Sequence, residues 1–304
     1  MEPILVTGSA GHIGRHVCAA LRGAGFRVRG LDLLAREPER GDIRDRIAVL
    51  RAVDGVAGII HLAAVSRVAD AEADPTNCVA TNVGGTRILL EAATHSARCP
   101  WFLFASSREV LGSIREGTVA DEATSPAPCN HYGHSKAESE RQVSAAASSG
   151  LTTCSLRLSN IFGSAWDREE RAIPSFVRSA IAAAPLRVRG PTREFDFLHV
   201  DDALRALLAV VAKLTDASAV PPVLQLCTGR SVALADAARV VLAATSSRSP
   251  LLLDSAAVHE VDRFCGSRAL AARTLGWRPR VSFETGIARL VTQRRVYVDP
   301  EVTC

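Results

Sequence analysis

The stretch ILVTGSAGHIG, residues 4–14, predicts a strand that runs through a tight turn into a helix. Three β-prone residues, 4–6, precede the glycines, and apolar residues recur at helical spacing after them. Gly8 would permit the turn, Gly11 would let a pyrophosphate approach the backbone, and Gly14 would let the helix pack on the strand. Unpaired N–H groups at the helix N-terminus favour phosphate there. The stretch therefore predicts a dinucleotide-binding site.

A second strand, residues 26–31, ends in Asp32 about twenty residues after the glycines. A carboxylate at this position can accept hydrogen bonds from both ribose hydroxyls of adenosine and would repel a 2′-phosphate. The sequence therefore favours NAD over NADP. Arg36 keeps NADP open as a minority alternative, although an arginine here is by default a solvated surface charge.

Length and composition favour a soluble protein that acts on a small molecule. The 304 residues can bury a large core as one α/β unit or two lobes. We find no run of about 18 apolar residues and no secretory leader, so we expect a cytoplasmic protein without a membrane span. A net charge of +4 with scattered arginines suits a phosphorylated small molecule better than nucleic acid. The eight cysteines lack C-x-x-C spacing and are expected to be reduced.

The chain contains only two lysines and two tyrosines, and one of each lies in NHYGHSK, residues 130–136. Tyr132 and Lys136 are four residues apart, so on a helix they share a face. A nearby ammonium is expected to lower the tyrosine pKa and make it a usable acid or base. Ser107, at a strand end, could bond the same substrate oxygen. Y-x-x-x-K also arises by chance, and the neighbouring histidines lack further ligands for a metal site.

Two other segments extend the predicted cofactor site. Small residues after the strand near 58–62, Ala63 and Ala64, would let a flat ligand lie across the strand end. His61, before them, is by default a structural histidine. Asn82 lies in a predicted helix over 77–93, where asparagine costs helix propensity. This cost indicates a tertiary hydrogen bond, with an exposed polar position as the equal alternative.

Alternating strands and helices continue to the end of the chain. We predict an α/β fold: a Rossmann-type, doubly wound parallel sheet with a smaller, partly interleaved C-terminal lobe. Residues 1–163 are expected to form the NAD-binding domain, with returning segments near 195–227. Residues 164–304 are expected to form mainly the substrate-binding lobe.

Together these motifs resemble the extended short-chain dehydrogenase/reductase superfamily, in particular its NAD-dependent nucleotide-sugar epimerases and dehydratases. The resemblance covers nearly the whole chain, in the order TGSAGHIG, GDIRD, HLAA, NVGGT, SSREVLG, YGHSK, RLSNIFG, FLHVDD and LGWRP. It implies that Tyr132 is the acid/base at the oxidised sugar hydroxyl, that Ser107 polarises this hydroxyl, and that Lys136 holds the nicotinamide ribose.

The resemblance and the residue patterns together define the expected site. The residues expected to contact NAD are Gly8, Gly11, His12, Ile13, Gly14, Asp32, Asp42, Ile43, Leu62, Ala63, Ala64, Asn82, Tyr132 and Lys136. The residues expected to contact substrate are Ser107, Arg108, Asn160, Arg193 and Arg263. No metal is expected.

Glu109 lies where dehydratases and uronate decarboxylases of this superfamily carry a catalytic glutamate. Arg108 stands where dehydratases usually have an aspartate acid, and an arginine cannot protonate a leaving group near neutral pH. A catalytic Glu109 and a carboxylate paired with a neighbouring arginine remain equal alternatives. Phe195 replaces an arginine with which many relatives bind the diphosphate.

The leading expectation is a nucleotide-sugar epimerase with tightly held NAD, which moves a hydride out of a sugar carbon, usually C4, and back. A dehydratase, decarboxylase or 4-ketoreductase acting on the same substrate class is the alternative. A non-catalytic NAD-binding sensor or scaffold is a minor alternative. The resemblance also implies a homodimer formed through the helices at about 82–96 and 132–149.

Overall fold

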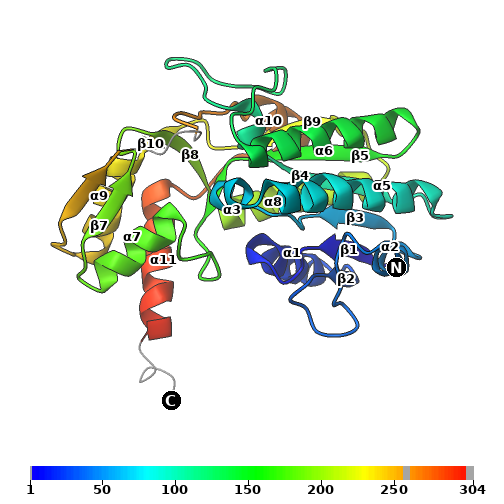
Figure 1. Cartoon of the computed structure of the whole chain (residues 1–304), viewed down its shortest axis with the longest axis horizontal. Helices are drawn as coiled ribbons and strands as arrows, with labels where there is room; N and C mark the ends of the chain where they lie inside the picture. The colour runs from blue at the N-terminus through cyan, green and yellow to red at the C-terminus, as the bar shows by residue number, and fades with distance from the viewer. Residues whose placement is uncertain (1, 256–260, 299–304) are drawn as a thin grey trace.

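The computed structural model describes residues 2–255 and 261–298. Within the predicted 164–304 lobe, residues 256–260 and 299–304 lie outside the described residues. The described chain consists of a large α/β part and a smaller part beside it that contains α7, α9 and α11 (Figure 1).

The large part is built on a six-stranded sheet in the order β2-β1-β3-β4-β5-β9, and every neighbouring pair is parallel. The strands are β1 (Ile4–Thr7), β2 (Val28–Leu31), β3 (Gly58–His61), β4 (Trp101–Ser107), β5 (Thr153–Leu158) and β9 (Val223–Leu226). The chain passes from β1 to β2 on one side and returns to β3 on the other. The carboxyl ends of β1 and β3 therefore flank the crevice where such sheets bind ligands. The predicted Rossmann-type parallel sheet is confirmed.

Helices cover both faces of this sheet, because its strands are apolar on both sides. Trp101 and Leu103 of β4 point into the core beneath α1 (His12–Gly23), α8 (Val200–Thr215) and α10 (Ala269–Leu275). Phe102 and Phe104, the alternate residues, point into the opposite core. That second core is covered by α2 (Arg46–Val53), α5 (Gly85–His95) and α6 (His131–Ser148).

The smaller part has its own core and two short sheets. One sheet has the order β10-β8-β6, from Ser231–Ala233, Glu194–His199 and Asn160–Phe162, and the other pairs β11 (Leu251–Asp254) with β7 (Leu186–Arg189). Its helices are α7 (Ala172–Ile181), α9 (Leu234–Thr245) and α11 (Phe283–Val298). Strands β6, β10 and β11 were not expected from sequence. Their three or four residues are too few to show a period.

Four short helical segments lie between the strands of the main sheet in the sequence, near its carboxyl end. These are α3 (Val68–Ala73), α4 (Pro75–Val79), the π-helix η1 (Ala80–Gly84) and the 3₁₀ helix η2 (Arg108–Leu111). Among the described helices, none combines the length and the apolar character needed to cross a bilayer.

The turn between β1 and α1 requires glycine at two positions. Gly8 adopts φ +72°, and a Cβ atom there would lie 2.7 Å from the Ala63 backbone nitrogen. At Gly14 a Cβ atom would lie 1.9 Å from the Gly8 carbonyl oxygen. Any larger residue at Gly14 would push α1 away from the turn. These glycines thus bring the helix N-terminus to the edge of the sheet.

Candidate active site

A cavity of about 740 Å³ opens at the carboxyl end of the main sheet, where ligands bind in folds of this kind. It is lined by most of the residues predicted to contact NAD: Gly8, Gly11, His12, Ile13, Gly14, Asp32, Asp42, Ile43, Leu62, Ala63, Ala64, Tyr132 and Lys136. Ser107, Arg108, Glu109 and Asn160 line it as well. The fold therefore gathers side chains that lie more than a hundred residues apart in the sequence.

One end of the cavity is formed by the glycine-rich turn and by Asp32. The Ala10 N–H donates to Asp32 Oδ2 at 3.0 Å, and the Leu34 N–H donates to Asp32 Oδ1 at 2.8 Å. These bonds hold the carboxylate at the end of β2 and leave it further lone pairs for a ligand's hydroxyls. Arg36 is exposed and does not line the cavity. This end fits the adenosine ribose of NAD better than a 2′-phosphate.

His12 at the start of α1 is neutral and poorly satisfied. Burial, with the charge of Arg171 as a lesser cause, lowers the pKa of His12 to about 3. Neither ring nitrogen has a hydrogen-bond partner among the described residues, and the nearest carboxylate oxygen, of Asp167, lies 3.9 Å from Nε2. A buried imidazole without partners beside a glycine-rich turn suits a bound ligand that offers hydrogen-bonding oxygens.

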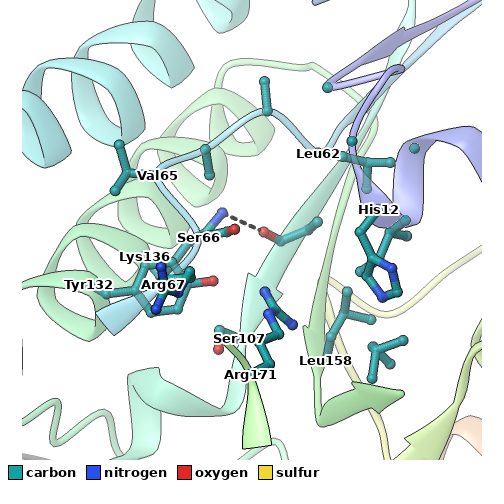
Figure 2. A pocket seen from close by; sticks show the side chains of 18 of the residues that line it. His12, Leu62, Val65, Ser66, Arg67, Ser107, Tyr132, Lys136, Leu158 and Arg171 are labelled. Carbon is teal, nitrogen blue, oxygen red and sulfur yellow. Dashed lines mark hydrogen bonds between the residues drawn. The ribbon is translucent and has the colours of Figure 1, made fainter. Parts of the chain in front are cut away.

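Ser107, Tyr132 and Lys136 meet at the other end of the cavity. Ser107 is the last residue of β4, whereas Tyr132 and Lys136 project from the first turns of α6. Ser107 and Tyr132 line the same cavity, and the Ser107 side chain favours the phenolate form of Tyr132. Lys136 Nζ donates to the Ala105 carbonyl at 2.8 Å and lies 4.7 Å from the Phe104 ring centroid (Figure 2). Figure 2 shows Tyr132 and Lys136 across the pocket from His12.

The tyrosine pKa differs from the sequence-based expectation. Burial raises the pKa of Tyr132 to about 12, and the Ser107 hydrogen bond and the charge of Arg171 oppose this rise only in part. The expectation that Lys136 would lower it is wrong for this structure, because the loss of solvation outweighs the charges nearby. Burial also lowers the pKa of Lys136 to about 8.

Glu109 lies in η2, directly after β4, and each of its two carboxylate oxygens has a partner in the protein. Its Oε1 lies 2.7 Å from Arg108 Nη2, and its Oε2 accepts from Asn130 Nδ2 at 2.8 Å. Asn130 is also the N-cap of α6, where its Oδ1 accepts from the Gly133 N–H at 2.8 Å. Glu109 thus connects η2 to the helix that carries Tyr132. Arg108 continues the network by donating from Nε to Asn160 Oδ1.

Three predicted site residues do not line the cavity. Asn82 is buried and bonds the Val65 backbone, with its Oδ1 accepting from Val65 N at 2.8 Å and its Nδ2 donating to Val65 O at 3.1 Å. The expected tertiary hydrogen bond is confirmed. It holds the backbone of Val65, which lines the cavity, whereas Asn82 itself does not line it. Arg193 pairs with Asp262, and Arg263 pairs with Glu194. Their role as substrate contacts stays a prediction, since in this structure both arginines lie outside the cavity lining and pair with carboxylates that also lie outside it.

His61 behaves as the structural histidine expected by default. It is 1% exposed, and its ring nitrogens lie 2.7 Å from Thr7 Oγ1 and 2.9 Å from Thr86 Oγ1. Among the residues that the structure describes, no group of three or more His, Cys, Asp or Glu side chains could hold a metal ion.

Asp167 and Arg171, which were not among the predicted site residues, also line the cavity from the segment between β6 and α7. This segment, SAWDREER, has no periodic pattern, so no sequence signal placed it over the site. Its high charge next to a predicted substrate-binding region was the available hint. Figure 2 shows the Arg171 side chain within the pocket.

Comparisons with known proteins agree with this geometry. A sequence profile of the NAD dependent epimerase/dehydratase family matches residues 4–221. A dTDP-glucose 4,6-dehydratase from an Actinoplanes species is 30% identical, over 96% of this chain and 97% of that protein. A UDP-glucose 4-epimerase from Rhizobium leguminosarum bv. trifolii is 31% identical, over 70% of this chain and 73% of its own length.

A solved structure, MoeE5 in complex with UDP-glucose and NAD, superposes with a TM-score of 0.89 at 26% identity, over 98% of this chain and 100% of that one. The glycine-rich turn, the carboxylate that ends β2 and the Ser107, Tyr132 and Lys136 cluster lie in the same cavity. The chain belongs to the NAD dependent epimerase/dehydratase family, an enzyme family of the extended short-chain dehydrogenase/reductase type.

Proposed function

We propose that this protein is an NAD-dependent nucleotide-sugar epimerase that acts by transient oxidation of a sugar carbon, C4 by the family resemblance. The observation that carries the proposal is that Ser107, Tyr132 and Lys136 line the same cavity as the glycine-rich turn and Asp32. The cavity thus has an acid/base at one end and a dinucleotide-binding edge at the other. Members of the family with bound ligands support this assignment, since MoeE5 is described with UDP-glucose and NAD.

When NAD is bound, it supplies the acceptor and the donor of the hydride. Tyr132 takes the proton of the sugar hydroxyl during oxidation and returns it during reduction, while Ser107 holds the hydroxyl in place. Ser107 and the charge of Arg171 favour the phenolate form of Tyr132. Lys136 is suited to hold the nicotinamide ribose. Asp32 receives the adenosine ribose. No net oxidation results from the two half-reactions.

The interactions that Arg108 and Glu109 make in the protein favour epimerisation over 4,6-dehydration. Elimination of water requires a base for the C5 proton and an acid for the leaving hydroxyl. Both oxygens of Glu109 are engaged, by Arg108 and Asn130, and Arg108 cannot donate a proton near neutral pH. A dehydratase is the second candidate, because a dTDP-glucose 4,6-dehydratase matches nearly the full length of the chain.

The test is to incubate the purified protein and NAD with UDP-glucose, UDP-galactose, UDP-glucuronate and dTDP-glucose. The sugar products are identified by NMR while absorbance reports NADH. We expect an isomeric sugar nucleotide from at least one substrate, without accumulation of NADH. A keto-sugar that has lost water would indicate the dehydratase, and stoichiometric NADH would indicate a dehydrogenase or ketoreductase.

Tyr132→Phe is expected to lower turnover by about 100-fold to 10,000-fold, because it removes the group that transfers the proton. NAD retained by this variant, measured by mass spectrometry of the released ligand, separates a catalytic defect from a cofactor defect. Unchanged turnover in Tyr132→Phe would contradict the assignment of the acid/base. Binding of NAD with no turnover of any nucleotide sugar would instead support the non-catalytic alternative.

We also propose a homodimer formed through α5 and α6, and a cytoplasmic location, both from the family resemblance. The exposed face of α6 includes small residues at Ala145 and Ala147, which would permit close helix packing. Size-exclusion chromatography with light scattering tests the dimer. A monomer at micromolar concentration would contradict it.

A further inference from the structure

We infer that Arg171 is a substrate-binding residue that holds an anionic group of the substrate next to the Tyr132 acid/base. The inference rests on the proposed function and assigns a role within the same site. Five lysine and arginine side chains line the cavity: Arg44, Arg67, Arg108, Lys136 and Arg171.

Four of these cations are already committed to partners in the protein. Arg44 bonds Asp42 and Asn77, and Arg67 lies 3.0 Å from Asp70. Arg108 is fixed by Glu109 and Asn160, and its guanidinium lies 4.5 Å from the Phe195 ring centroid. Lys136 donates to the Ala105 carbonyl. Arg108 Nη1 has no hydrogen-bond partner among the described residues, but its Nη2 is held by Glu109. A ligand that takes both terminal nitrogens of Arg44, Arg67 or Arg108 would therefore have to displace a protein partner.

Arg171 differs because the two terminal nitrogens of its guanidinium have no hydrogen-bond partner among the described residues. Its closest carboxylate oxygen belongs to Asp167 and lies 3.5 Å from Nε, beyond normal hydrogen-bond distance. Asp167 is 2% exposed and accepts from the Arg168 N–H at 2.9 Å. The buried carboxylate therefore orients the Arg171 side chain by its charge and leaves the forked end of the guanidinium free.

The free end lies in the cavity between His12 and Tyr132. The Asp167 oxygen nearest Arg171 lies 3.9 Å from His12 Nε2, and the charge of Arg171 opposes the rise of the Tyr132 pKa. We assign its ligand to the substrate. Arg171 precedes α7, lines the same cavity as Ser107 and Tyr132, and points into it (Figure 2). Asp32, the predicted adenosine contact, lies at the opposite end of the cavity. A guanidinium fork matches the paired oxygens of a carboxylate or a phosphate. Two parts of a nucleotide sugar supply such oxygens: a sugar carboxylate, as in a nucleotide uronate, and the diphosphate.

Calorimetric titration of the NAD-loaded protein separates these sources. The probes are UDP, UDP-glucose and UDP-glucuronate, titrated into the wild type, Arg171→Gln and Arg168→Gln. Arg168 is a matched control, since it lies three residues away, outside the cavity lining, and pairs with Asp70 at 2.9 Å. We expect Arg171→Gln to weaken substrate binding by about tenfold to a hundredfold, the range for a lost charged hydrogen bond. Arg168→Gln should stay within about twofold of the wild type.

The pattern of losses identifies the group that Arg171 holds. A loss confined to UDP-glucuronate assigns the sugar carboxylate and a uronate substrate, whereas an equal loss for all three probes assigns the diphosphate. Arg171→Lys, which keeps the charge but not the fork, should lose less than Arg171→Gln and guards against a folding defect. Unchanged affinity for all probes in Arg171→Gln, or a loss confined to NAD, overturns the inference. Failure of the wild type to bind any probe would contradict the proposed function itself.

Discussion

At the scale of single residues, the site combines a raised tyrosine pKa with a lowered lysine pKa, and both shifts have burial as their main cause. A protein gains no stability from enclosing an ammonium that lacks a carboxylate partner within bonding distance. Lys136 is held instead by a carbonyl oxygen and an aromatic ring. The arrangement favours function over stability, as is common in active sites.

Lys136→Met is therefore expected to be inactive and yet more stable than the wild type at pH 7. The shift of the Lys136 pKa from 10.5 to about 8 corresponds to a destabilisation of about 3 kcal/mol, present in full below pH 8. Between about pH 8 and 10.5 the unfolded chain binds the proton that the folded chain has lost, so wild-type stability rises relative to the variant. Urea denaturation at pH 7 and pH 9.5 measures the difference. A stability gap that does not shrink at the higher pH would contradict the buried ammonium.

At the scale of elements, the first turn of α6 and the 3₁₀ helix η2 are joined through Asn130. One side chain caps the helix that carries Tyr132 and Lys136, and it also satisfies Glu109. The junction is close, because a Cβ atom on Gly133 would lie 2.6 Å from the Glu109 carbonyl oxygen. The position of Tyr132 on α6 relative to Ser107 at the end of β4 therefore depends on the two hydrogen bonds of Asn130.

Asn130→Asp should be less stable than Asn130→Ser, although aspartate is an equally good helix cap. Serine keeps the cap acceptor and loses the donor to Glu109, which is expected to cost about 1–3 kcal/mol. Aspartate sets a second buried carboxylate against Glu109 and should cost more. Urea denaturation measures both variants. Asp45→Ser, at the N-cap of the exposed start of α2, is the control and should change stability by about 0.5 kcal/mol or less.

At the scale of the whole molecule, sequence reasoning succeeded where a pattern is local and periodic. Spacing along the chain predicted the first turn and the position of Asp32, because these signals lie within one βαβ unit. Alternating strand and helix patterns predicted the parallel sheet. The cavity lining at Tyr132 and Lys136 follows from their four-residue separation.

Other features depend on contacts between distant segments and could not be predicted. Arg193 and Arg263 were expected in the substrate site, but their carboxylate partners, Asp262 and Glu194, lie about seventy residues away in the sequence. The pKa of Tyr132 depends on burial, which spacing does not reveal. Arg171 enters the site from an irregular segment that only the tertiary structure brings to the cavity.

The central claim is that one hydride leaves a sugar carbon and returns to the same carbon within this cavity. It is tested most directly with a nucleotide sugar deuterated at C4, using the sugar that gives an isomeric product in the substrate panel. The account predicts that NMR and mass spectrometry of the product will find the deuterium retained at C4 of the epimer, with no accumulation of NADH. Deuterium found on another carbon, or lost from the sugar, would contradict epimerisation by transient oxidation at C4.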